Sequence, residues 1–274
     1  MKILIKKAKI IDTSSKYNNK TYDVLINNNI IEKIGKSIRI DAETKVYKKD
    51  NLHISQGWLD MHVNFGQPGF EQRETINNGL NAAAKGGFTE VLLMPNTYPS
   101  IDNGTMIDYI KGFNNNSVVK IQVAGNLTKK QKGQNIVEIH DMISSGCVAF
   151  TDDKKSIQSN ELMKIGLLYI KNTSSLIMNY PNDKKIQNNG VINEGKISTQ
   201  LGLRGIPNIA EHMMVDRDIT LCTYTDSRIH ESYISTKESV EKIHTAKNNG
   251  LNITSDVALH NIFLTIRDSR CYPH

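Results

Sequence analysis

Apolar and polar positions follow two different rhythms along the chain. Up to about residue 54 they alternate in runs such as ILIKKAKIID and YDVLINNNIIEKIG, which is the pattern of half-buried strands. Asn27, Asn28 and Asn29 interrupt the second run at a place where a hairpin would turn. We therefore predict a small β-rich N-terminal unit over residues 1–54.

From residue 55 onward, short apolar runs alternate with helical patterns. The strand-like runs are HISQGWLDMHVNF, TEVLLMPN, VVKIQVAGN, CVAFTDD, SLIMNYP, RIHESYIS and NITSDVAL. Among the helical patterns, RETINNGLNAAAKGG is expected to close at Gly86, and STKESVEKIHTAKNNG is expected to open with a Ser235–Glu238 capping box. Near-continuous apolar strands joined by helices indicate a parallel sheet with crossover helices.

The number of strands favours a closed sheet over an open one. Seven strand-and-helix repeats suit a (β/α)8 TIM-type barrel, but an eighth is needed for closure, and the chain ends LTIRDSRCYPH after the seventh. We predict an α/β fold: a TIM-type β/α barrel lacking its eighth strand over residues 55–274, preceded by the β-rich unit. Such a barrel would leave two strand edges unpaired, so we expect poor solubility unless an oligomer covers them.

Composition narrows the class of protein. The 274 residues carry a net charge of +6, but the lysines are spread in short clusters and no nucleic-acid motif accompanies them, so we expect a solvated basic surface and no nucleic-acid partner. No apolar run is long enough to span a membrane, and the N-terminus lacks the apolar core of a signal peptide. We expect a cytoplasmic protein without a disulfide framework, since Cys147, Cys222 and Cys271 are few and widely spaced.

We looked for candidate functional residues where the predicted strands end, because barrels of this type have their active sites at the carboxyl ends of the strands. The first such strand carries His62 and Asn64. Residues i and i+2 of a strand face the same side, so a His at both positions would form a metal clamp. An asparagine oxygen is a poor zinc ligand, which leaves two roles open for His62: a metal ligand or a hydrogen-bonding residue.

The other strand ends also allow two interpretations each. Asp152 and Asp153 could bind metal or form an acidic cluster at a helix N-terminus. The phenols of two tyrosines do not replace imidazole at neutral pH and favour packing in a cavity. Two histidines could bind a ligand or simply pack. These four residues are Tyr180, Tyr233, His230 and His260.

Several blocks, in this order along the chain, resemble the dihydroorotases of the amidohydrolase superfamily. They are GWLDMHVNFGQPGFEQRETINNGLNAAAKGGFTEVLLMPNTYPSID, GCVAFTDD, NEGKISTQLGLRGIPNIAE, YISTKESVEKIHTAKNNGLNITSDV and HNIFLT. The resemblance implies metal-assisted opening or closing of a cyclic amide, dihydroorotate to carbamoyl aspartate. In that chemistry zinc polarises the ring carbonyl and generates the hydroxide nucleophile, and an aspartate late in the barrel shuttles the proton.

The resemblance also implies which metal ligands this chain keeps. His62 matches the first histidine of the family's metal pair, and Asp153 matches the bridging carboxylate. Asn64, Tyr180 and Tyr233 stand where the family has histidine ligands. We therefore expect the zinc of the family to be absent here or weakly bound.

The substrate-binding groups are likewise only partly kept. Asn96 and His260 match substrate-binding positions, whereas Gly66 replaces the arginine that grips the substrate carboxylate. The catalytic aspartate belongs to the eighth strand, so no catalytic residue is expected here. The resemblance then predicts a dihydroorotase-like protein of pyrimidine biosynthesis with weak or lost activity.

Two alternatives remain open. The chain could be a non-catalytic scaffold, as a homo-oligomer or as a partner of another pyrimidine-pathway enzyme such as aspartate carbamoyltransferase. It could also be a product of gene decay, since the tail RDSRCYPH is unlike the family's continuation.

Overall fold

The computed structural model describes residues 1–264, apart from the side chain of Asn116, and its backbone contacts separate two compact units. The first, Met1–Trp58, contains β1 (Lys2–Ile11), β2 (Thr21–Asn27), β3 (Ile30–Gly35), β4 (Lys45–Tyr47) and β5 (His53–Ser55). Their order is β3-β2-β1-β4, and β5 also pairs with β1. The predicted hairpin is confirmed: Asn28 and Asn29 adopt the positive φ that tight hairpin turns require. The predicted domain boundary at residue 54 stays a prediction.

The second unit, from Leu59 onward, is built on a seven-stranded sheet in the order β14-β13-β10-β9-β8-β7-β6. Its strands are β6 (Trp58–Val63), β7 (Phe88–Leu93), β8 (Lys120–Gly125), β9 (Ala149–Phe150), β10 (Leu176–Asn179), β13 (Ile229–Glu231) and β14 (Ile253–Ser255). Every register from β7 to β14 is parallel. The α/β class and the seven successive strands agree with the sequence pattern. The absence of an eighth strand from the protein stays a prediction.

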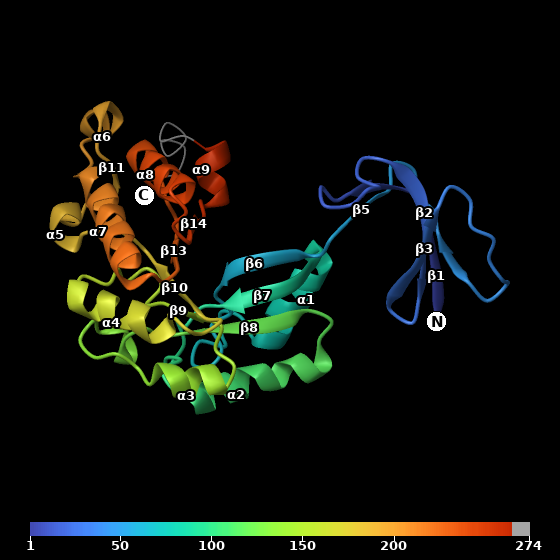
Figure 1. Cartoon of the computed structure of the whole chain (residues 1–274), viewed down its shortest axis with the longest axis horizontal. Coiled ribbons are helices and arrows are strands. Elements are labelled where there is room, and N and C mark those ends of the chain that lie inside the picture. Colours follow the sequence, from blue (N-terminus) through green and yellow to red (C-terminus); the bar gives the residue numbers. More distant parts are fainter. Residues whose placement is uncertain (265–274) are drawn as a thin grey trace. The chain divides into compact units, whose positions relative to one another are not determined.

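Helices cover the outside of this sheet (Figure 1). They are α1 (Ile76–Gly86), α2 (Gly104–Lys111), α3 (Ile139–Ser144), α4 (Asn160–Ile170), α7 (Ile209–Thr225) and α8 (Lys237–Asn248), with 3-10 turns η1 (Gly112–Asn116) and η2 (Lys129–Gln131). The polar excursion after β10 folds into α5 (Lys184–Gln187), β11 (Ile192–Asn193), α6 (Lys196–Leu201) and β12 (Gly205–Ile206), and α9 (Leu259–Phe263) follows β14. None of the helices in residues 1–264 is both long and apolar enough to cross a membrane.

Side chains along each strand point alternately to the two faces of the sheet, so the core has two layers. On β7, Val91 and Leu93 pack in the large cluster beneath the helices, whereas Leu92 packs with residues such as Ala149 and Met178 on the opposite face. A strand that is buried on both faces needs a near-continuous apolar run, which is why these strands stand out in the sequence. Cys147 and Cys222 are buried free thiols in this core, as expected, while Cys271 lies outside the described residues.

Some predicted element ends are wrong, for local reasons. The segment HISQGWLDMHVNF forms two strands, β5 and β6, rather than one. Helix α1 ends at Gly86, but the left-handed residue that closes it is Gly87, with φ of 86°. The strand predicted over RIHESYIS stops at Glu231, because Tyr233 has a φ of 59°, which extended backbone does not allow.

The predicted Ser235–Glu238 capping box is also wrong. Glu211 on α7 accepts the backbone N–H groups and the hydroxyls of both Ser235 and Thr236, which holds Ser235 outside the helix. The oxygen of Thr236 then accepts the N–H of Ser239 and caps α8 one residue later.

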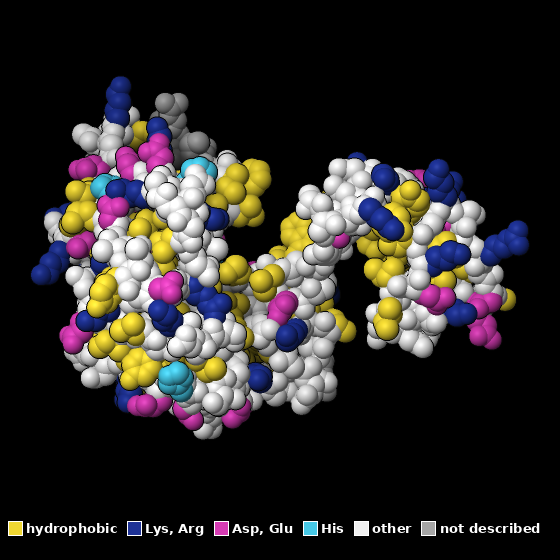
Figure 2. Space-filling model, in the orientation of Figure 1, with side chains coloured by type: hydrophobic (Ala, Val, Ile, Leu, Met, Phe, Trp, Pro, Cys, Tyr) yellow, Lys and Arg dark blue, Asp and Glu magenta, His cyan; other side chains and the backbone are white. Residues whose placement is uncertain are grey.

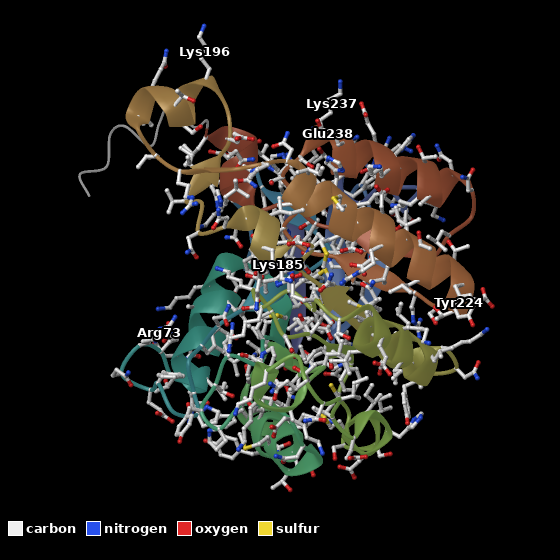
Figure 3. All side chains as sticks on the ribbon, turned by 90° about the vertical axis from the view of Figure 1, so that its left-hand side faces the viewer. Arg73, Lys185, Lys196, Tyr224, Lys237 and Glu238 are labelled. Atoms are coloured by element: carbon white, nitrogen blue, oxygen red, sulfur yellow. The ribbon has the colours of Figure 1, made fainter. Side chains whose placement is uncertain are left out.

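Basic side chains are spread over the surface of this second unit. Figure 2 shows Lys and Arg scattered among acidic groups on the visible face. Lys196 on α6 and Lys237 at the start of α8 extend away from the chain (Figure 3). This distribution suits the predicted solvated basic surface. The expectation of no nucleic-acid partner stays a prediction.

Candidate functional site at the carboxyl ends of the strands

The carboxyl ends of the parallel strands carry most of the polar side chains that the sequence analysis named as candidates. We call this edge of the sheet the strand-end rim. Most of these residues stand at the end of a strand or in the loop after it: His62 on β6, Asn64 after it, Asn96 after β7, Asp153 after β9, Tyr180 after β10, His230 on β13 and Tyr233 after it. His260 lies further on, in α9, which follows β14. Because parallel strands end at one edge of their sheet, the rim is where a site of this fold is expected.

Three side chains form the tightest group on the rim, which we call the His–Asp–His cluster. Nε2 of His62 lies 2.7 Å from Oδ2 of Asp256, and Nε2 of His230 lies 2.9 Å from the same oxygen. β6 and β14 stand at opposite ends of the strand order, so this contact requires the sheet to curl until its first and last strands meet at the rim.

The surroundings of the cluster fix its orientation. Nδ1 of His230 lies 2.8 Å from Oγ1 of Thr254, and the backbone N–H of Tyr233 donates to Oδ1 of Asp256 at 2.6 Å. Burial opposes ionisation of Asp256, but hydrogen bonds from His230, His62 and Tyr233 outweigh it and hold the pKa of this carboxyl far below its ordinary value. Asp256 is therefore a carboxylate at neutral pH.

Asp256 is the rim residue that sequence reasoning did not select. It follows β14 directly, in NITSDVAL, as Asp152 and Asp153 follow β9. That position was the available signal, because a carboxylate directly after a parallel strand lies at the rim wherever it occurs.

A second group contains Asn64, Asn96 and Asp153. The amide of Asn96 donates to Oδ1 of Asn64 at 3.1 Å and, through a shorter hydrogen bond, to Oδ2 of Asp153. Oδ1 of Asp153 is buried and has no hydrogen-bond partner. The amide oxygen of Asn64 thus accepts a hydrogen bond from Asn96, which also contacts Asp153. The substrate-binding role of Asn96 stays a prediction.

Asp152, next to Asp153, has a structural role. Its Oδ1 accepts the backbone N–H groups of Leu127 and Thr128 at 3.0 and 2.9 Å, and its Oδ2 accepts the hydroxyl of Thr128. Burial raises the pKa of this carboxyl, although these hydrogen bonds oppose the shift. Asp152 therefore anchors the loop after β8, a contact that neither interpretation of this residue included.

The two rim tyrosines pack as aromatic rings. The ring of Tyr233 lies 4.5 Å from that of His62 and 6.2 Å from that of Tyr180, between centroids. Burial raises the pKa of both phenols, and the charges of Asp153 and Asp256 raise that of Tyr233 further. Both phenols stay protonated at neutral pH, so neither supplies an anionic oxygen to a metal.

A pocket of about 470 Å³ opens beside these rings. Tyr180 and Tyr233 line it together with Lys154, Lys184 and His260, among other residues. Of the two predicted substrate-binding residues, His260 therefore lines the pocket, whereas Asn96 belongs to the group around Asp153. The basic groups give the pocket a positive character, which suits a small anionic ligand.

The ligand positions of the family's zinc centre do not fit that centre in this chain. An amide already hydrogen-bonded and two protonated phenols stand at three of them, Asn64, Tyr180 and Tyr233. Of the two retained residues, His62 contacts Asp256, while Asp153 contacts Asn96. The orphan oxygen of Asp153 belongs to no group of three potential ligands in the described residues.

Gly66 stands where the family has an arginine, and the backbone at this position favours glycine. Its φ is 85°, and a Cβ there would meet the carbonyl oxygen of Phe70 at 2.8 Å. We predict that Gly66→Arg costs roughly 1–3 kcal/mol from the left-handed backbone, with a further cost from the contact, and restores no substrate binding. Thermal unfolding measures the first effect and dihydroorotate titration the second.

Two glycines separate the causes of that loss. Gly133→Arg tests the positive φ in open space, and Gly112→Arg tests the added arginine where neither strain nor a neighbour within 4 Å exists. We expect Gly112→Arg to be the most stable of the three variants, Gly133→Arg to be intermediate and Gly66→Arg to be the least stable. Wild-type stability of Gly66→Arg together with new dihydroorotate binding contradicts this prediction.

Comparison with solved structures supports the fold. The L-hydantoinase (dihydropyrimidinase) from Arthrobacter aurescens aligns with a TM-score of 0.77 at 16% identity, covering 98% of this chain and 61% of that chain. The D-hydantoinase (dihydropyrimidinase) from a Thermus species aligns with a TM-score of 0.69 at 17% identity, covering 98% and 60%. At these identities the likeness concerns the fold alone, and it is consistent with a TIM-type α/β barrel.

Comparison of sequences identifies the family. The dihydroorotase of Thermoanaerobacter sp. (strain X514) is 41% identical over 97% of this chain and 61% of its own length, and that of Pelotomaculum thermopropionicum is 40% identical over 97% and 62%. The chain thus spans about three fifths of the relatives it matches. Residues 52–239 match the family model described as dihydro-orotase-like. As its sequence blocks predicted, this chain belongs to the dihydroorotase-like family.

Proposed function

We propose that this chain is a dihydroorotase-family protein of pyrimidine biosynthesis in which hydrolysis of dihydroorotate is weak or lost. The observation that carries the proposal is the state of three ligand positions. Asn64 is hydrogen-bonded to Asn96, and Tyr180 and Tyr233 are packed, protonated phenols. None of the three offers the nitrogen or charged oxygen that zinc prefers.

The size of the expected loss follows from what the metal does in this chemistry. Metal-assisted hydrolysis needs an ion that polarises the carbonyl and generates hydroxide at neutral pH. Disturbing even an outer partner of a metal ligand costs about 10–100-fold in affinity or activity. Counting only tenfold for each of the three positions, turnover falls roughly 1,000-fold or more below that of an intact relative.

The test is a dihydroorotate assay in both directions, with metal analysis of the purified chain. The Thermoanaerobacter dihydroorotase, assayed in parallel, provides the reference. We expect turnover at least roughly 1,000-fold below that reference with added zinc. Stoichiometric zinc together with turnover near the reference would refute the proposal.

A non-catalytic role as a partner subunit is a second candidate, which α9 favours. Leu259, Ile262 and Phe263 are 70%, 62% and 75% exposed, and Figure 2 shows hydrophobic side chains gathered where α9 lies in Figure 1. Exposed apolar groups of this size on one short helix are typical of a surface that binds another chain. The partner we propose is a second copy or a pyrimidine-pathway enzyme such as aspartate carbamoyltransferase.

Light scattering after size-exclusion chromatography tests this role, with the chain alone and mixed with aspartate carbamoyltransferase from the same organism. We expect an oligomer or a mixed complex that Ile262→Lys weakens, with the exposed Tyr224→Lys on α7 as the matched control. A monomer under both conditions counts against the role.

A further inference from the structure

The His–Asp–His cluster has the composition of a metal site although it is not the family's set of ligands. Nε2 of His62, Nε2 of His230 and Oδ2 of Asp256 all lie within 4.8 Å of one another. Of these residues only His62 stands at a ligand position that the family resemblance assigns. His230 on β13 and Asp256 directly after β14 stand at no metal-ligand position that the resemblance assigns.

Two imidazole nitrogens and one carboxylate oxygen are a donor set that divalent zinc, cobalt and iron bind, with positions left for water or a ligand. Exposure decreases from Asp256 (23%) through His62 (14%) to His230 (4%), so the group is buried on one side and reachable from the other. This gives an ion a path to the carboxylate without exposing the deepest histidine.

The residues behind the cluster resemble the supports of a metal site. The second ring nitrogen of His230 is held by Thr254, and the second oxygen of Asp256 is held by the Tyr233 N–H. Outer partners of this kind orient ligands and raise metal affinity. Nδ1 of His62, by contrast, is buried without a hydrogen-bond partner.

We propose that His62, His230 and Asp256 bind a single divalent transition-metal ion, of the zinc and cobalt class, at the strand-end rim. The ion takes the place of the hydrogen bonds that join the two rings to Asp256 in its absence. The inference does not depend on the proposed function, because it concerns binding and not turnover.

The test uses the full chain, stripped with a chelator and titrated with Co²⁺ and then Zn²⁺. We expect one cobalt ion per chain, a visible absorption band from its coordination, displacement by zinc, and a higher melting temperature with either ion. Asp256→Asn and His230→Asn should weaken binding by at least about tenfold, and Thr254→Val by about 10–100-fold through His230. His62→Gln is a further ligand variant if Asp256→Asn does not fold.

Two controls locate the ion. His244→Asn changes an exposed histidine on α8 and should leave cobalt affinity unchanged. Asp153→Asn separates this site from the family's remnant: we expect unchanged affinity, and abolished binding in that variant alone overturns the proposal. No stoichiometric metal, or wild-type affinity in the Asp256 and His230 variants, also overturns it.

Turnover distinguishes this inference from the proposed function. Metal binding without dihydroorotate hydrolysis supports both proposals. If the chain binds no metal and hydrolyses no dihydroorotate, the metal-site inference is wrong and the proposed function still stands. Hydrolysis near the rate of the reference dihydroorotase overturns the proposed function whatever the metal does.

Discussion

Replacing Arg217 by methionine is expected to destabilise the fold by about 3–5 kcal/mol, a large share of the stability of most domains. Nε of Arg217 donates to Oδ1 of Asp218 at 2.9 Å, Nη2 lies 2.7 Å from the same oxygen, and Nη1 donates to the carbonyl of Ile157 at 2.5 Å. Methionine keeps most of the packing volume but leaves Asp218, whose side chain is fully buried, without its counter-charge.

The loss should come from that uncompensated charge and not from the missing guanidinium. The double variant Arg217→Met, Asp218→Asn removes the charge as well and should recover part of the loss. Arg228→Met is the matched control, because Arg228 donates only to the neutral carbonyls of Thr173 and Ser175. Its expected cost is smaller, about 1–3 kcal/mol.

Thermal unfolding followed by circular dichroism measures all three variants. The charge explanation fails if the double variant is no more stable than Arg217→Met, or if Arg228→Met costs as much. Either result would mean that the packing of α7 against β10 and β13 matters more than the ion pair.

The fold could be predicted because its signal is local. Buried parallel strands such as TEVLLMPN need apolar residues on both faces, and Val91 and Leu92 indeed pack on opposite sides of β7. Element ends depend on distant residues instead. Thr236 caps α8 because Glu211, 24 residues before Ser235, holds Ser235 away from the helix. The residues next to the cap in the sequence do not contain that information.

The site could be predicted only in part, for the same reason. The strand ends and the family's ligand positions are readable in the sequence, so His62 and Asp153 were expected on the rim. Which residues contact each other there depends on how far the sheet curls. His62 contacts Asp256, 194 residues away, whereas Asp153 contacts Asn96. His62 and Asp153 both match metal-ligand positions of the family, but this match did not predict that they contact different residues.

Glu231 gives the second large expected effect, a fall in stability as pH rises above about 4.5. The register of β10 and β13 places Glu231 beside Asn179, and the amide of Asn179 donates to Oδ2 of Asp218 on α7 at 2.6 Å. Burial raises the pKa of Glu231 well above its ordinary value of 4.5, and the charge of Asp218 raises it further. Protonated Glu231 also shares a hydrogen bond with Asp218, so the folded chain holds this proton more tightly than the unfolded chain does.

The sign of the effect follows from proton counts. Above pH 4.5 the unfolded chain releases the Glu231 proton while the folded chain keeps it, so each pH unit in that window lowers the free energy of unfolding by about 1.4 kcal/mol. Asp218 and Asp152, whose pKa values burial also raises, act in the same direction. Asp256 acts oppositely, because its lowered pKa removes stability only as pH falls below 3.8.

Glu231→Gln isolates the contribution of this one group, since glutamine keeps the shape of the protonated acid and cannot ionise. The difference in stability between this variant and the wild type should favour the variant increasingly as the pH rises above 4.5. The exposed Glu241→Gln on α8 should leave the pH profile unchanged. A wild-type profile parallel to that of Glu231→Gln would mean that the proton of Glu231 leaves in the folded state as easily as in the unfolded one. The guanidinium of Arg217 would then have to stabilise two buried carboxylates, those of Asp218 and Glu231, and the stability lost in Arg217→Met would be larger still.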